Sequence, residues 1–184
     1  MFKIMLRCGL RLEETASLTK DAVDLKSQQL VVYCGKGKKD RIVFISDDAK
    51  AALSRYLKQR YSSRIKKIFL VEKGIYKGKP ISVHGIKKRM EYYAKKSGVK
   101  ASCHHLRHTM ATQMLTADTD LVTIQMLLGH SRITTTERYS KVHNAKARRD
   151  YFKAMRFITE KSQYPSELQS GYRHFFTKKR REQV

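Results

Sequence analysis

The sequence predicts an α+β fold that is mainly α-helical, with one small antiparallel β-hairpin inserted early. Several segments after residue 46 carry apolar residues at helical spacing and begin or end at capping residues. One earlier stretch, "QQLVVYCGKGKKDRIVFIS", instead has two β-rich runs around a loop that contains glycine. At 184 residues the chain fits a single domain, and its 41% hydrophobic content suffices for a core.

The first half of the chain predicts a helix, the hairpin and a second helix. "LEETASLTKDAV", directly after Arg11, predicts a short helix that runs into a turn, and strands are predicted at Leu30–Cys34 and Arg41–Ile45. Ser46 is the predicted N-cap of the next helix, because two aspartates and then apolar residues at helical spacing follow it. "KKIFLV", residues 66–71, predicts a further strand.

The second half of the chain predicts helices only. They are expected at Ser82–Ser97, which Gly98 ends, at His105–Thr116, and at Leu121–Leu128, which Gly129 closes. The capping-box pattern of Thr134 and Glu137 predicts another helix start, with Tyr139 in the first turns. A last helix, about Ala145–Glu160, has an apolar stripe that consists of Ala147, Tyr151, Ala154, Met155 and Ile158.

The charge balance points to a polyanionic partner. The chain has 40 Lys and Arg against 16 Asp and Glu, a formal net charge of +24. Such a field attracts nucleic acid, whereas a few excess charges would be enough to keep a protein in solution. An anionic membrane surface is a weaker alternative, because the sequence shows no basic amphipathic helix with an apolar insertion face.

The cysteines and the first residues predict an intracellular protein. Cys8, Cys34 and Cys103 lack CxxC spacing, and the N-terminus has no apolar run long enough for a signal peptide or membrane span. The expected location is the cytoplasm, in association with the nucleoid, or the host-cell cytoplasm if the source is viral.

The segment "CHHLRHTMATQML" could hold either a metal or a phosphate. His104 and His108 have the i, i+4 spacing of zinc ligands, but the metalloprotease pattern requires Glu where His105 stands. The fixed positive charge of Arg107 opposes a dication and suits an anion. The sequence therefore favours a phosphate here, and it predicts no metal and no other cofactor.

Five motifs occur in order along the chain: "GLRLEE", "GKGKKDR", "HHLRHTMAT", "LLGHS" and "TTERYSKV". With them the chain resembles the tyrosine recombinase (phage integrase) family, most closely Xer-type and integrase catalytic domains, over about Met5 to Val142. The resemblance implies a mainly helical catalytic domain with a small antiparallel sheet. It also implies a site-specific recombinase that cleaves and rejoins duplex DNA through a 3′-phosphotyrosyl intermediate.

The resemblance further implies a role for each motif residue. Arg11 and Arg107 would clamp the non-bridging oxygens of the scissile phosphate, and Lys36 would protonate the leaving 5′ oxygen. His104 would be the acid/base partner of the nucleophile, and His130 would hydrogen-bond the phosphate or steady the tyrosine. The nucleophile would be Tyr139, activated by a base and by positive charge, because a free phenol has a pKa near ~10.

Taken singly, these residues have plainer interpretations. Either arginine could be a surface phosphate contact or an ion-pair partner of Glu13, Glu14 or Asp120, and Lys38 or Lys39 could take the place of Lys36. A histidine after Gly129 is also typical of a helix end, and a lone tyrosine of half-buried packing. His105 and His108 are expected to be structural.

The chain departs from the family pattern at its start. The family usually places two helices and an N-terminal DNA-clamping domain before the first arginine, whereas ten residues precede Arg11 here. We therefore interpret residues 1–162 as a catalytic domain whose first helices are missing, with apolar faces exposed, and residues 163–184 as a basic C-terminal tail.

Double-stranded DNA is the expected partner, together with further copies of the chain in a tetramer on synapsed DNA and with accessory or directionality proteins. The helix at about Ala145–Glu160 is expected either to dock into a neighbouring protomer or to pack within its own chain. Two other functions stay open. One is a truncated DNA-binding fragment with little activity, and the other is a nicking-closing enzyme that resembles type IB topoisomerases.

Overall fold

The computed structural model describes residues 1–33, 40–60, 65–129 and 140–161, with residues 140–144 and 161 described by their backbone alone. Helices and strands within these ranges follow one another in the order α1 (Phe2–Cys8), α2 (Leu12–Ser17), a 3-10 turn (Lys20–Ala22), β1 (Val23–Asp24), β2 (Gln29–Val32), β3 (Arg41–Phe44), α3 (Asp47–Gln59), α4 (Val83–Ser97), α5 (Cys103–Thr116), α6 (Leu121–Leu128) and α7 (Ser140–Lys161). The predicted fold class, mainly helical with a small antiparallel sheet, is confirmed.

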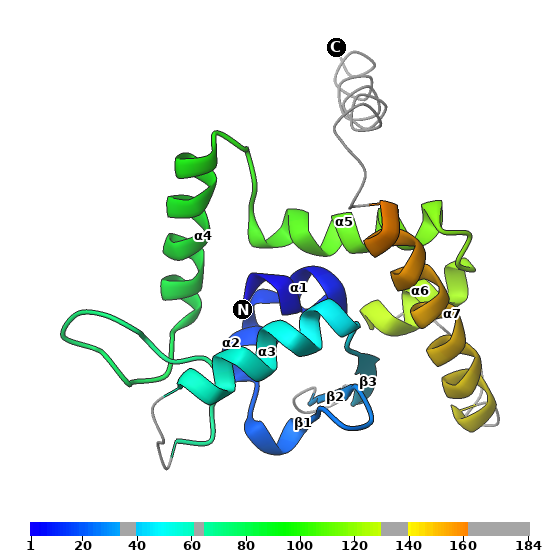
Figure 1. Ribbon diagram of the computed structural model, residues 1–184, viewed down its shortest axis with the longest axis horizontal. Coiled ribbons are helices and arrows are strands. Elements are labelled where there is room, and N and C mark those ends of the chain that lie inside the picture. Colours follow the sequence, from blue (N-terminus) through cyan, green and yellow to red (C-terminus); the bar gives the residue numbers. More distant parts are fainter. Residues whose placement is uncertain (34–39, 61–64, 130–139, 162–184) are drawn as a thin grey trace.

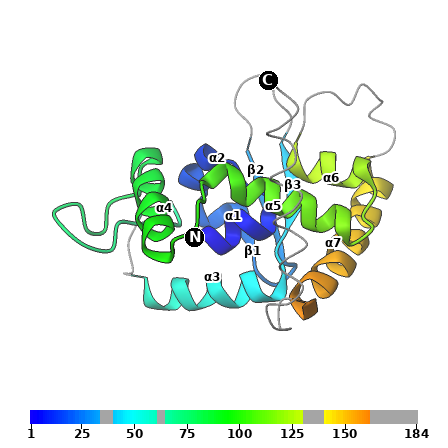
Figure 2. The same cartoon turned by 90° about the horizontal axis from the view of Figure 1, so that it is seen from above.

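Helix α1 lies in the middle of the molecule, between α3 and α5 (Figure 1). Helix α4 stands at one end, and α6 and α7 form the other end (Figure 2). None of the helices in the described ranges combines the length and apolar character that a bilayer crossing needs.

The sheet contains the predicted hairpin and one additional strand. Strands β2 and β3 pair antiparallel, with Val31 opposite Ile42, and the short β1 adds to the other edge of β2. The prediction of a strand at residues 66–71 is wrong. Lys67 and Leu70 form only isolated bridges, to Thr19 and Pro80, and the apolar run reflects burial of the intervening residues.

The predicted helices are confirmed, with corrections at their starts. Helix α5 begins at Cys103, because the Ser102 side chain accepts a hydrogen bond from the His105 N–H and caps it. Ser46 does precede α3, but its hydroxyl donates to Asp48 Oδ1 at 2.5 Å and caps no backbone N–H. The helix start predicted at Thr134–Glu137 lies outside the described residues.

Two buried apolar clusters make up the core. One joins α1, the sheet, α3 and the first half of α4, and the other joins α5, α6 and α7 around Phe44. Each fully buried large apolar side chain contributes roughly 1.5–3 kcal/mol relative to its exposed state. The predicted stripe of the last helix belongs entirely to the second cluster, so that face packs within its own chain.

Tyr151 connects the last helix to the first. Its ring is fully buried and lies 5.7 Å from the ring of Phe44, centroid to centroid, and its hydroxyl donates to the Arg7 carbonyl at 3.1 Å. Helix α1 was not predicted from the sequence. Its apolar residues lie in the first cluster, and its Arg7 carbonyl accepts a hydrogen bond from Tyr151 of the second cluster, so both clusters fix its position.

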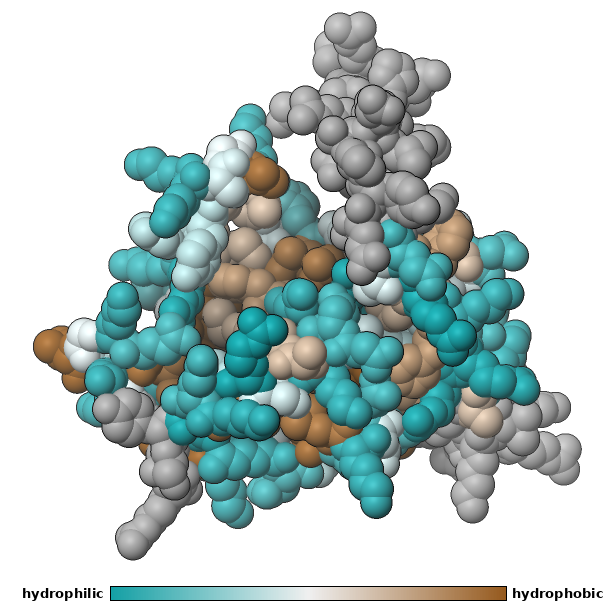
Figure 3. Space-filling model, in the orientation of Figure 1, coloured by the Kyte–Doolittle hydropathy of each residue, from teal (hydrophilic) through white to brown (hydrophobic). Residues whose placement is uncertain are grey.

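Apolar surface is visible in the hollow beside α4 in the space-filling view (Figure 3). A pocket of about 390 Å³ lies where α1 begins, lined among others by Met1, Phe2, Phe69, Ile81 and Tyr93. The rings of Phe2 and Tyr93 meet edge to face at 6.2 Å, and Tyr93 is 46% exposed. Apolar side chains are thus partly open to solvent at this place.

Gly9 is expected to be essential for the turn between α1 and α2. Its φ is 63°, and an added Cβ would lie 2.8 Å from Leu128 Cδ2 and 3.2 Å from Met110 Sδ. We expect Gly9→Ala to lower the free energy of unfolding by about 2–4 kcal/mol, measured by denaturant titration, because left-handed strain and overpacking add.

Gly98→Ala is the matched control. Gly98 has a φ of 69°, but no atom lies within 4 Å of an added Cβ. That substitution should cost only about 1 kcal/mol, the left-handed strain alone. Equal losses for the two variants would show that the contact with Leu128 and Met110 contributes nothing.

Candidate functional site: an arginine clamp at the end of α6

Three arginines from distant parts of the chain donate to three successive carbonyls at the carboxyl end of α6. Arg41 Nε binds the Leu127 oxygen at 3.0 Å, Arg107 Nη2 binds the Leu128 oxygen, and Arg11 Nη2 binds the Gly129 oxygen at 3.0 Å. Carbonyls at a helix end lack helical partners and carry the negative end of the helix dipole. Three positively charged side chains therefore meet at the end of α6, where they bind backbone carbonyls and no carboxylate of that helix.

Arg11 occupies the N-cap position of α2 and reaches the cluster through its side chain. Its backbone N–H donates to Glu14 Oε2 at 2.7 Å and its Nη1 donates to Glu14 Oε1 at 2.8 Å. The side chain remains 43% exposed. The guanidinium is therefore oriented by the protein and still open to a ligand.

Glu14 is shared between Arg11 and Arg41. Arg41 Nη1 and Nη2 donate to its two oxygens at 2.9 and 2.8 Å, and both side chains of this pair are nearly buried. Burial raises the pKa of Glu14, but the hydrogen bonds from Arg41 and Arg11 outweigh it and lower the pKa to about 2. Glu14 is thus ionised throughout the physiological range.

Arg107 is buried in α5, and its guanidinium meets only backbone oxygens among the described residues. Nη1 donates to the Gly9 carbonyl at 2.5 Å and Nη2 to that of Leu128. Burial, and next the charge of Arg11, lower the pKa of Arg107 to about 10, against the opposing effect of Glu14. A bound anion would relieve this unfavourable electrostatic environment.

His104 lies on the exposed face of the first turn of α5 and contacts another histidine. Its Nε2 is 2.7 Å from the Nε2 of His108, one turn later, and the rings meet edge to face at 4.3 Å. Burial, followed by the neighbouring His104, His105 and Arg107, lowers the pKa of His108, which favours its neutral form. His108, expected to be structural, therefore contacts a site residue.

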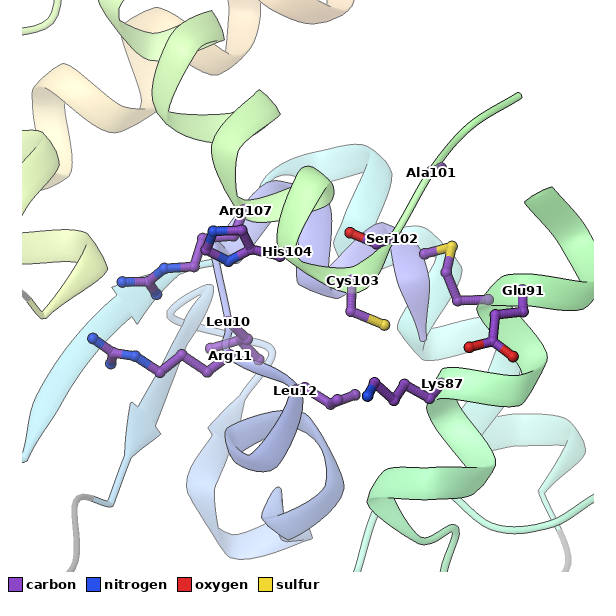
Figure 4. A pocket seen from close by; sticks show the side chains of 11 residues that line it. Leu10, Arg11, Leu12, Lys87, Glu91, Ala101, Ser102, Cys103, His104 and Arg107 are labelled. Atoms are coloured by element: carbon purple, nitrogen blue, oxygen red, sulfur yellow. The ribbon is translucent and has the colours of Figure 1, made fainter. Parts of the chain in front are cut away.

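Arg11, His104 and Arg107 line one pocket of about 450 Å³ (Figure 4). Figure 4 shows the side chains of Arg11 and Arg107 extending toward the same side. The rest of the wall comes from α4 and from the residues around the starts of α2 and α5, namely Leu10, Leu12, Lys87, Met90, Glu91, Ala101, Ser102 and Cys103. The structure thus brings Arg11 next to His104 and Arg107 of α5, from which it is distant in the sequence.

The other three predicted site residues, Lys36, His130 and Tyr139, lie outside the described residues. Among the described residues, no group of three or more His, Cys, Asp or Glu side chains could hold a metal ion. Of the plainer interpretations, the ion pair between Arg11 and Glu14 is present, whereas Asp120 pairs with Lys146.

Glu14 and Arg41 belong to the site as well, although neither was predicted from the sequence to have a functional role. Glu14 lies three residues after Arg11, so helical spacing alone could have identified it as the residue that orients that arginine. Arg41 closes the motif "GKGKKDR" and begins β3, and its burial was not evident from the sequence. Only the fold shows that its side chain faces Glu14.

The low pKa of Glu14 predicts a pH-dependent contribution to stability. A carboxyl whose pKa is depressed in the folded state stabilises the fold above its unfolded pKa, near 4.5 here, and loses this effect as pH falls to about 2. In urea unfolding at pH 6, 4.5, 3.5 and 2.5, we expect Glu14→Gln to be destabilised by roughly 3 kcal/mol at pH 6.

The difference from the wild type should shrink steadily below pH 4.5, because the unfolded wild-type chain then takes up a proton at Glu14 that the folded chain accepts only near pH 2. Asp24→Asn is the control, since Asp24 also has a lowered pKa but is fully exposed and contacts only the backbone and side chains of its own turn. A Glu14→Gln deficit that stays constant over this range would contradict the ion-pair explanation.

The chain is similar to proteins of a known family. The model of the phage integrase family matches residues 1–146. The tyrosine recombinase XerC of Thermodesulfovibrio yellowstonii is 39% identical over 148 residues, which cover 77% of this chain and 49% of that protein. The chain thus spans about half the length of the curated relatives it matches.

Solved structures of recombinases are also similar to this chain. A crystal structure of XerA recombinase has a TM-score of 0.65 and 27% identity, covering 89% of this chain and 57% of that one. XerH recombinase bound to its difH substrate has a TM-score of 0.59 at 21% identity, covering 78% of this chain and 44% of that one, and shows likeness of fold. With its motif arginines clustered at one helix end and the family model matching most of its length, the chain belongs to the phage integrase family.

Proposed function

We propose that the chain is the catalytic part of a site-specific DNA recombinase or integrase that cleaves and rejoins duplex DNA through a 3′-phosphotyrosyl intermediate. One observation carries the proposal: Arg11 and Arg107 are anchored on adjacent carbonyls of one helix end, beside His104, with no carboxylate bound to Arg107 among the described residues. Two guanidinium groups that are held by adjacent carbonyls and extend toward the same side suit the non-bridging oxygens of a phosphodiester.

The charge of the cluster fits the reaction. Three arginines and one glutamate leave two positive charges, whereas a phosphodiester carries one negative charge and its pentavalent transition state carries more. Positive groups that are fixed in advance stabilise the charge that develops in the transition state, with no reorganisation during the reaction. The clamp is thus better matched to the transition state than to the bound substrate.

The remaining steps are assigned from the motifs. The Tyr139 oxygen attacks the scissile phosphorus while His104 accepts the phenolic proton, with His130 bound to the phosphate or to the tyrosine. The bond to the 5′ oxygen breaks, and Lys36 supplies the proton to that oxygen. The products are a 3′-phosphotyrosyl protein and a free 5′-hydroxyl, and the retained phosphoester energy allows rejoining without ATP.

The partners belong to the same proposal. Duplex DNA is the substrate, and a tetramer of the chain's full-length form on two synapsed sites carries out strand exchange, with accessory proteins setting direction. Residues 1–162 act as the catalytic domain and residues 163–184 as a basic tail. The net charge of +24 supports binding to DNA. The proposed location is inside the cell.

Formation of a covalent adduct tests the function directly. We expect the purified chain, mixed with a library of nicked duplexes that release the 5′ fragment, to give an SDS-stable adduct that mass spectrometry maps to Tyr139. Tyr139→Phe should bind DNA with unchanged affinity and form no adduct, because only the nucleophilic oxygen is removed.

Sequencing the trapped DNA would define the preferred duplex. An adduct that persists in Tyr139→Phe would overturn the assignment of the nucleophile. Salt-sensitive DNA binding by the folded wild-type chain without any adduct would identify a DNA-binding fragment instead. Relaxation of supercoiled plasmids that lack the preferred sequence would favour the nicking-closing alternative.

Substitution of one clamp residue tests the phosphate site. Arg107→Lys keeps the charge but loses the planar fork that binds two carbonyls, so the single-turnover rate of adduct formation should fall by about a hundredfold or more. Arg148→Lys is the control, since Arg148 lies on α7 with its guanidinium 5.5 Å from the Phe152 ring. A near-normal rate in Arg107→Lys would refute the clamp.

A further inference from the structure

We propose that Arg41 is a positioning residue for the phosphate clamp, one that fixes the guanidinium of Arg11 without touching the DNA. The inference rests on the proposed function and deepens it. Arg41 lies at the first position of β3, and its guanidinium bridges two segments of the site: the acidic residue of α2 and the carboxyl end of α6.

All three guanidinium nitrogens of Arg41 are engaged within the protein. Nη1 and Nη2 donate to the two oxygens of Glu14 at 2.9 and 2.8 Å, and Nε donates to the Leu127 carbonyl at 3.0 Å. The side chain is only 9% exposed. A guanidinium with this burial and this set of partners is placed to hold protein groups together, whereas the 43% exposed Arg11 is placed to meet a ligand.

The end of α6 is shaped to accept this side chain. At Gly129, where φ is 65°, an added Cβ would lie 2.9 Å from Arg41 Cδ and 3.0 Å from Arg41 Cζ. Arg41 therefore packs directly against the backbone of Gly129. The same glycine presents its carbonyl oxygen to Arg11 Nη2 at 3.0 Å.

Both partners of the Arg11 guanidinium are thus located by Arg41. Arg11 Nη1 binds Glu14 Oε1, the oxygen that also accepts from Arg41 Nη1, and Arg11 Nη2 binds Gly129, against which Arg41 packs. Without Arg41, Glu14 would lose its bidentate partner and Arg11 would regain rotational freedom. Fixed geometry is what makes such a group effective, since a misplacement of about 1 Å can cost about a hundredfold in rate.

The test compares two substrates of the preferred nicked duplex, one with a normal scissile phosphate and one with a methylphosphonate there. The methylphosphonate lacks a charged oxygen, so it depends less on the arginine clamp. On the phosphodiester, we expect Arg41→Met to lower the single-turnover rate of adduct formation by about tenfold to a hundredfold. On the methylphosphonate, the rate of adduct formation should fall by less than about threefold. The affinity for DNA should also change by less than about threefold.

Two comparison variants make the result specific. Arg11→Met should show the same substrate selectivity, and the double variant should be no slower on the phosphodiester than Arg11→Met alone, because the two residues act through one group. Arg55→Met removes an exposed arginine from α3 and should change neither rate. If Arg41→Met does not fold, Arg41→Lys, which cannot bind Glu14 and Leu127 together, replaces it with the same expectations.

Three results would overturn the role of Arg41 alone. Equal losses on both substrates, or losses that multiply in the double variant, would show that Arg41 supports the fold in general and does not act through Arg11. An unchanged phosphodiester rate in a folded Arg41 variant would remove its role altogether. Absence of any adduct with the wild-type chain would instead overturn the proposed function, and with it this inference.

Discussion

The binding of three arginines to the carboxyl end of α6 is the interaction on which the site depends. Burial of a guanidinium is costly unless its donors are satisfied, and carboxylates normally provide both acceptors and countercharge. Here four backbone carbonyls accept hydrogen bonds from the three guanidinium groups, and one carboxylate, Glu14, binds Arg11 and Arg41. The desolvation cost is offset by hydrogen bonds and by the helix dipole, while most of the positive charge remains available to an anion.

The same interaction ties the site to the core. The Gly9 carbonyl that anchors Arg107 belongs to the left-handed turn after α1, and two residues earlier the Arg7 carbonyl accepts the buried hydroxyl of Tyr151. Side chains of Leu128 and Met110 lie so close to Gly9 that an added Cβ would force them to shift. Core packing between α1, α5, α6 and α7 therefore sets where Arg107 lies, and a change in that packing would move the clamp.

Local signals explain what the sequence could predict. Helices α4 and α6 were predicted because apolar residues recur at helical spacing and a glycine ends each of them, and the hairpin because its strands flank a glycine-containing loop. Helix α1 has seven residues and no side-chain cap, and the buried run at residues 66–71 imitates a strand, so both were misjudged. Arg11, His104 and Arg107 were predicted through motifs. The pairing of Glu14 with Arg41 has no periodicity along the chain, so only the fold shows it.

Two buried arginines illustrate how a structural cation differs from a functional one. Arg7 on α1 donates to the Asp48 carboxylate at 3.1 Å and to Gln113, so its charge is compensated inside the protein. Arg107, equally buried, has backbone oxygens as partners, and its pKa is lowered by burial and by neighbouring arginines. A second carboxylate beside Arg107 would make the fold more stable and the clamp weaker toward phosphate. In the proposed reaction, the overall charge of +24 would attract DNA from any direction, and this local lack of compensation would select one phosphate and hold it in place.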